Sequence, residues 1–193
     1  ITSGMNALAH AAEGLYAQDL NPMTRLMAME GIASLAKALP LIRMQSDHTE
    51  GRARALYGAW LCGSVLGSVG MALHHKLCHT LGGSFNLPHA EVHTVVLPHA
   101  LAFNAMAAPD AMNDLAHTLG VDNGPLGVYQ LAKDNGAPVA LKDIGMKAAD
   151  LDLAADLAVK QPYWNPRPFG LAQRDEIRAL LQRAFEGVTP GYG

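Results

Sequence analysis

The chain has 193 residues, of which 50% are hydrophobic and 16% charged, with a formal net charge of −3. This length and apolar content suffice for one well-buried domain. The 14 lysines and arginines are scattered, which argues against a nucleic-acid surface, and no apolar run approaches the roughly 18 residues needed to cross a bilayer. Cys62 and Cys78 favour reduced thiols, so we expect a cytoplasmic protein without a signal peptide.

Apolar residues recur at helical spacing along most of the chain, and the breaks fall at Pro, Gly and Asn. The first helix is expected over residues 3–18, and Pro22 begins a second that runs to residue 38. Pro40 is expected to open a new piece, and Asp150 to cap a short helix. Further helices are expected over 50–69, 99–107, 110–119, 124–135, 150–159 and 172–186, with a proline-rich loop over 161–168.

Four glycines interrupt the helix expected over residues 50–69 and its end: Gly58, Gly63, Gly67 and Gly70. Each glycine inside a helix costs roughly 1 kcal/mol relative to alanine. We therefore predict that another backbone comes close to these positions. The spacing also resembles a membrane dimerisation motif, but the neighbouring Arg52 and Arg54 and the short apolar run argue against that interpretation.

Six of the nine histidines lie between Gly70 and His99. His75 and His79 are four residues apart and therefore share one face of a helix, which we expect to stop at Gly82-Gly83. His89 follows a Leu-Pro turn and could be aimed at the same point. His74 is rotated by roughly 100° from His75 and should face elsewhere.

A second pair with the same spacing, Asn6 and His10, occurs on the first predicted helix. It could supply the fourth ligand that the three imidazoles of His75, His79 and His89 lack. The alternative is that these histidines are structural core residues. The convergence of several titratable groups favours a functional pocket.

The pattern His75, His79, Gly82, Pro88 and His89 resembles the iron-containing (group III) alcohol dehydrogenase family. The segment Leu97-Pro98-His99 also fits. This resemblance implies an all-α, bundle-like helical domain of the dehydroquinate synthase type over residues 1–193. It also implies that the chain is one half of a longer enzyme, whose N-terminal α/β nucleotide-binding domain is lacking here and is its expected partner. The residues that bind the nucleotide would then lie mostly outside this chain.

Within that family, the doubled His74-His75 and the strings KLCHTLGGSFNLPHAE and SGMNALAHAAEGLYA resemble the maleylacetate reductases. The resemblance implies reduction of a small dicarboxylate, maleylacetate, to 3-oxoadipate with NADH or NADPH in aromatic-compound catabolism, and a homodimer. Asn6 stands where the alcohol dehydrogenases have a metal-binding Asp. A neutral amide oxygen is a weaker ligand than a carboxylate, so Fe or Zn binding should be weaker.

The resemblance gives each residue an expected role. His79 would be the catalytic proton carrier, and its ordinary pKa range suits that task. The loop over 161–168 is either a rigid turn or a cover that brings Tyr163 or Arg167 to a substrate carboxylate. The expected metal ligands, or remnants of a metal site, are Asn6, His10, His75 and His89, and the expected substrate-binding residues are His74, His93, Tyr163 and Arg167.

Two other functions fit parts of the pattern. The first is an Fe- or Zn-dependent alcohol or aldehyde dehydrogenase of the same fold, which would need no cationic groups for substrate carboxylates. The second is a helical interaction or dimerisation module with a vestigial site, which the density of histidines disfavours. Activity on simple alcohols compared with a dicarboxylate would separate the dehydrogenase from the dicarboxylate reductase, and the interaction module predicts no ligand binding by the full-length protein.

Overall fold

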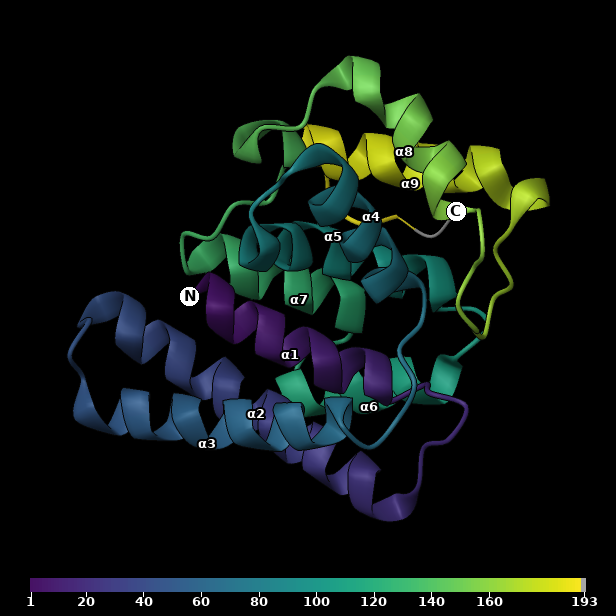
Figure 1. Ribbon diagram of the computed structural model, residues 1–193. Coiled ribbons are helices and arrows are strands. Elements are labelled where there is room, and N and C mark those ends of the chain that lie inside the picture. The colour runs from purple at the N-terminus through teal and green to yellow at the C-terminus, as the bar shows by residue number, and fades with distance from the viewer. Residues whose placement is uncertain (192–193) are drawn as a thin grey trace.

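A computed structural model describes residues 1–191, which form helices and short connections without any strand (Figure 1). The all-α prediction is confirmed. No helix in this part of the chain is long and apolar enough to span a membrane. The α-helices are α1 (Thr2–Gly14), α2 (Pro22–Met44), α3 (Thr49–Leu66), α4 (Leu73–Phe85), α5 (His89–Asn104), α6 (Pro109–Leu119), α7 (Gly124–Asp134), α8 (Leu151–Ala158) and α9 (Arg174–Glu186). Short 3₁₀ turns occupy Leu141–Ile144, Ala148–Asp150 and Leu171–Gln173.

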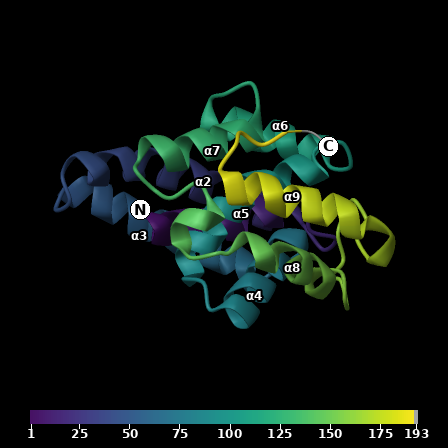
Figure 2. The same ribbon diagram turned by 90° about the horizontal axis from the view of Figure 1, so that it is seen from above.

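The helices are arranged around α1 and α5. In Figure 1, α2 and α3 form a long antiparallel hairpin on one side of the molecule, and α8 and α9 lie on the other. Helix α1 packs against α2, α3 and α5, while α4 packs against α5 and α8. The view from above places α5 near the middle, below α9 (Figure 2).

Helix α5 is buried on all sides, because every residue from Val92 to Asn104 is buried. A helix that is apolar all round is a central core helix. It contributes Leu97 and Leu101 to an apolar cluster with α1, α2 and α3, and Val92 and Val95 to a second cluster with α4, α8 and α9. The polar side chains of α5 from residue 92 onward, including His93, are therefore held in the interior of the protein.

Three predicted boundaries were wrong. The helix expected over 99–107 is the end of α5, which runs through Pro98 from His89 to Asn104. The other two lie at Pro40 and at Gly82-Gly83. Helix α2 continues through Pro40 to Met44, because Leu41 and Ile42 pack beside Gly51 at the start of α3. Helix α4 passes through Gly82-Gly83 to Phe85, which packs against the second apolar cluster. Its end is set by Asn86, whose φ of 53° lies in the left-handed region that asparagine tolerates. In both cases tertiary packing outweighs a weak local signal.

The end of α1 and the capping of α8 also differ from the prediction. Helix α1 ends at Gly14 rather than at residue 18, and the following Leu15 to Ala17 form a buried turn. Gly14 lies so close to α3 that a Cβ atom there would come within 2.5 Å of Val65. Asp150 precedes α8 as expected but makes no side-chain capping bond, because a 3₁₀ turn leads into the helix instead.

Candidate active site

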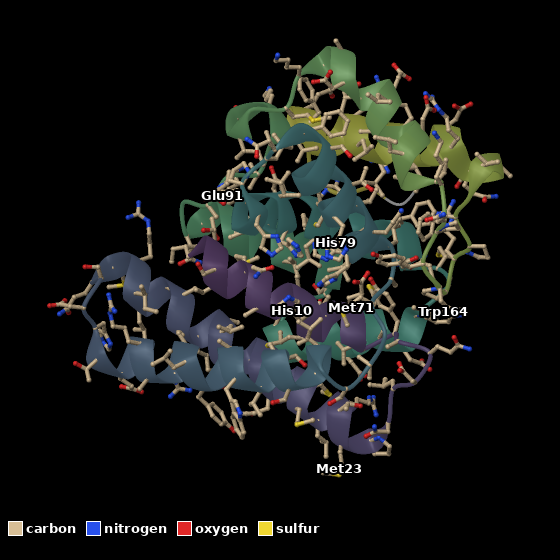
Figure 3. The ribbon with its side chains drawn as sticks, viewed as in Figure 1. His10, Met23, Met71, His79, Glu91 and Trp164 are labelled. Atoms are coloured by element: carbon tan, nitrogen blue, oxygen red, sulfur yellow. The ribbon has the colours of Figure 1, made fainter. Side chains whose placement is uncertain are left out.

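Six histidines from three helices gather between α1, α4 and α5. The ring centroids of His10 and His75 are 5.2 Å apart, and those of His75 and His93 are 5.0 Å apart. His89 lies 4.3 Å from His93, and His79 lies 5.9 Å from His75. Figure 3 shows the labelled His10 and His79 near the centre of the molecule. We call this group the histidine cluster; it consists of His10, His74, His75, His79, His89 and His93.

His93 lies at the centre of the cluster. It is 1% exposed, and neither ring nitrogen has a hydrogen-bond partner among the described residues. Burial, followed by the charges of His75 and His89, lowers its pKa to about 2. Burial and the charge of His75 likewise lower the pKa of His10 to about 4. Both rings are therefore neutral near pH 7 and keep a lone pair available.

Sequence reasoning missed Glu13, which is fully buried on α1. One of its carboxylate oxygens lies 2.5 Å from Nδ1 of His75. The carboxylate also accepts the backbone N–H groups of His74 at 2.8 Å and of His75 at 3.3 Å. A lone carboxylate in the stretch from Ala7 to Gly14, which is apolar apart from His10, was the available signal, because an unpaired charge is very rarely buried.

His74 does not face away from the cluster, as helix phase alone predicted. It is fully buried, and its Nδ1 lies 3.4 Å from Nδ1 of His75. Its Nε2 lies 3.1 Å from the carbonyl oxygen of His93. That carbonyl belongs to the neighbouring helix α5. The angular offset between His74 and His75 on α4 therefore points His74 toward α5, in another part of the same buried cluster.

The outer part of the cluster carries His79 and His89, which are both exposed. Nδ1 of His79 lies 3.1 Å from the hydroxyl of Tyr163, on the proline-rich loop. The ammonium of Lys76 lies 5.7 Å from the centre of the Tyr163 ring. Burial, followed by the charge of His75, lowers the pKa of His79. The structure thus brings Tyr163 to the predicted proton carrier.

Arg167 is held differently. Its guanidinium lies 4.1 Å from the centre of the Phe103 ring, donates to the Phe103 carbonyl at 3.1 Å and pairs with Glu176 at 2.5 Å. These contacts tie the loop to α5 and α9. None of the contacts described for Arg167 involves the histidine cluster, so its substrate-binding role stays a prediction.

The loop is anchored by Asn165, which is 7% exposed. Asn165 and Asn104 exchange two side-chain hydrogen bonds, of 2.6 and 3.0 Å. The side-chain Oδ1 of Asn165 also accepts a hydrogen bond from the backbone N–H of Leu73 at 3.3 Å. Together, Asn165 and Glu13 satisfy the first three backbone N–H groups of α4, which would otherwise lack partners at a helix start. Residues distant in sequence therefore cap the helix that carries three histidines of the cluster.

The donor atoms of the site fit a divalent cation. Nε2 of His75 and Oδ1 of Asn6 are buried and have no partner among the described residues. Neutral imidazole nitrogens and an amide oxygen are acceptable ligands for Zn²⁺ or Fe²⁺. One nitrogen each from His74, His75 and His93 lie within 4.8 Å of one another, so this buried triad could also hold a metal. The predicted set of Asn6, His10, His75 and His89 shares only His75 with the triad and stays a prediction.

Comparison with characterised proteins gives close matches along the chain. It is 56% identical over 190 residues to maleylacetate reductase from Burkholderia cepacia, covering 98% of this chain and 53% of that protein. The crystal structure of maleylacetate reductase from a Rhizobium species superimposes with a TM-score of 0.94 at 54% identity, over 98% of this chain and 53% of that one. The chain therefore spans about half the length of these relatives.

A second structural relative is an iron-containing alcohol dehydrogenase from Corynebacterium glutamicum, with a TM-score of 0.89 at 42% identity over 95% of this chain and 51% of that one. Residues 1–185 match the description "Fe-containing alcohol dehydrogenase family, C-terminal". The buried histidines, the all-helical fold and this match over nearly the whole chain agree, and the chain belongs to the iron-containing alcohol dehydrogenase family, of which it matches the C-terminal part.

Proposed function

We propose that this chain is the helical half of an NADH- or NADPH-dependent reductase that converts maleylacetate to 3-oxoadipate in aromatic-compound catabolism. The observation that carries the proposal is the histidine cluster on a chain 56% identical to a maleylacetate reductase over 190 residues. The nucleotide would bind mainly to an N-terminal domain, as expected for a protein about twice this length. A homodimer in the cytoplasm completes the proposal.

The outer part of the cluster suits a dicarboxylate. His79, His89 and Lys76 are nitrogen groups at the accessible end of the site, with the Tyr163 hydroxyl beside them. Hydrogen bonds from such donors to carboxylate oxygens are charge-assisted and roughly twice as strong as neutral ones. Two substrate carboxylates therefore have several donors available, whereas a neutral alcohol would use few of them.

The reaction requires stabilisation of an enolate. A bound reduced nicotinamide would supply a hydride to the alkene carbon β to the ketone, and negative charge would then develop on the ketone oxygen. Imidazole N–H groups aimed at that oxygen stabilise its developing charge. When Tyr163 donates its hydroxyl proton to Nδ1 of His79, the ring carries its own proton on Nε2. As Nε2 gives its proton to the carbon α to the ketone, Nδ1 takes the hydroxyl proton of Tyr163, so the ring stays neutral, and the Tyr163 oxygen recovers a proton from solvent.

Metal binding at Asn6, His10, His75 and His89 would add one further contribution. A bound Fe²⁺ or Zn²⁺ would polarise the ketone oxygen as a Lewis acid. The alternative function, an Fe- or Zn-dependent alcohol or aldehyde dehydrogenase, is favoured by the unpartnered Asn6 oxygen and the 42% identity to an iron-containing alcohol dehydrogenase.

The deciding experiment uses the full-length enzyme. We expect maleylacetate to drive NADH or NADPH oxidation at a kcat/KM at least about 100-fold above that of any simple aldehyde, because only the dicarboxylate engages the outer donors. Metal content and activity with and without a chelator are measured on the same preparation. About one metal per chain with chelator-sensitive activity would support a working metal site; full activity without metal would assign enolate stabilisation to the imidazoles. Preference for a neutral alcohol or aldehyde would overturn the reductase proposal.

A further inference from the structure

The carboxylate of Glu13 is the most unusual buried group in the molecule. It is 0% exposed, and one of its oxygens lies against Nδ1 of His75. Its other contacts are two backbone N–H groups and the hydroxyl of Tyr16, at 3.4 Å. Burial of a carboxylate is costly unless hydrogen bonds compensate it. A neutral asparagine or serine could cap a helix start at lower cost, so capping α4 does not explain a charged residue here.

The contact with His75 fixes which ring nitrogen carries the proton. An ionised carboxylate only accepts hydrogen bonds, so the short contact of 2.5 Å requires the proton on Nδ1. A second proton on Nε2 would be buried without an acceptor among the described residues, so Nε2 is a bare lone pair. It is buried, has no partner among the described residues, and belongs to a ring that lies 5.2 Å from His10 and 5.0 Å from His93.

The hydrogen bonds of the neighbouring His74 ring are consistent with a proton on Nδ1 of His75. Nε2 of His74 lies 3.1 Å from the His93 carbonyl oxygen, which also only accepts, so His74 carries its proton on Nε2. Nδ1 of His74 is then an acceptor and lies 3.4 Å from the Nδ1–H of His75. The three groups Glu13, His75 and His74 are consistent with one set of proton positions.

We infer that Glu13 is a positioning residue of this site: it holds His75 as the Nδ1–H tautomer, so that an unprotonated Nε2 faces the space between α1, α4 and α5. The role of that lone pair in turnover rests on the proposed function, but the tautomer itself does not. Carboxylates that orient a functional histidine in this way typically change metal affinity or activity by about 10- to 100-fold when replaced.

The test compares wild-type full-length enzyme with Glu13→Gln. In the variant, the amide NH₂ group can face Nδ1 of His75, and the ring proton must then move to Nε2. Alternatively the NH₂ group faces the backbone N–H groups of α4, and the cap is then lost. Nitrogen NMR of ¹⁵N-histidine-labelled, metal-free enzyme reports the tautomer, and His75→Gln identifies the His75 signals. We expect unprotonated Nε2 in the wild type, a protonated Nε2 in Glu13→Gln, and a kcat about 10- to 100-fold lower in that variant.

Leu115→Ala is the matched control for loss of stability, because Leu115 is fully buried on α6 within the first apolar cluster. It should lower the melting temperature while leaving the His75 signals and kcat unchanged. The inference is overturned if Nε2 of His75 is protonated in the wild type, a result that needs no variant to fold and no substrate. It is also overturned if Glu13→Gln keeps both the wild-type tautomer and a kcat within about twofold of the wild type, a margin well below the loss expected for such a carboxylate. Failure of the proposed function would instead appear as absent maleylacetate reduction by the wild type.

Discussion

His79 is one of the two exposed members of the histidine cluster, and its Nδ1 lies 3.1 Å from the hydroxyl of Tyr163. As the proposed proton carrier it contributes to the reaction and little to the core. His79→Ala in the full-length enzyme should lower kcat by about 10²- to 10⁴-fold, the usual effect of a positioned general acid. The same substitution should change the free energy of unfolding of the enzyme by no more than about 0.5 kcal/mol, as at most surface positions.

Tyr163→Phe tests the same proton carrier with a milder change than His79→Ala. It removes only the hydroxyl beside Nδ1 of His79, so kcat should fall less than in His79→Ala while the loop stays anchored by Asn165. Steady-state kinetics and urea unfolding of both variants decide the question. A wild-type kcat in His79→Ala would remove the residue from the proposed mechanism.

At the scale of single helices, some glycines of α3 are required for close packing against α2, and others have no such role. A Cβ atom on Gly58 would lie 2.9 Å from Leu35 and 3.0 Å from the Gly31 carbonyl oxygen of α2, so the prediction of a close backbone is confirmed there. A Cβ atom on Gly63 would have no neighbour within 4 Å, and the same prediction was wrong at that position. Close approach of α2 and α3 therefore depends on Gly58 and not on every glycine in the series.

The two positions form a matched pair of substitutions on one helix. Gly58→Ala should destabilise the protein by about 1 to 3 kcal/mol, because α2 and α3 must move apart. Gly63→Ala should stabilise it by up to about 1 kcal/mol, since alanine has the higher helix propensity and meets nothing. Urea unfolding measures both. Equal effects of the two substitutions would contradict the close packing at Gly58.

For the whole molecule, buried neutral histidines make the free energy of unfolding depend on pH. Burial and the charge of Arg183 lower the pKa of His99 to about 4, and neither of its ring nitrogens has a partner among the described residues. Between pH 6.5 and 4 the unfolded chain therefore binds protons that the folded protein does not, so stability is lost as the pH falls through this range. His10 and His93 act in the same direction.

His99→Leu should reduce this dependence, since it removes one such group and leaves an apolar side chain in a buried position. Between pH 7 and 4.5 the variant should lose about 2 to 3 kcal/mol less unfolding free energy than the wild type. Denaturant titration of the full-length protein at both pH values gives the difference. Parallel losses in the two proteins would mean that His99 is not neutral in the folded state.

The sequence by itself determined the helical class, the proline-rich loop and the spacing of His75, His79 and His89, because these follow from local periodicity along one chain segment. It did not determine where α2 and α4 end, since packing against Gly51 and the second apolar cluster outweighs the propensities of Pro40 and Gly82. Nor did it find Glu13 or the central place of His93. Spacing within a helix says which residues share a face of that helix, whereas these two residues acquire their roles from neighbouring helices that pack beside their own. The assembly of the site, including the capping of α4 by a loop residue 92 positions away, was therefore decided only by the tertiary structure.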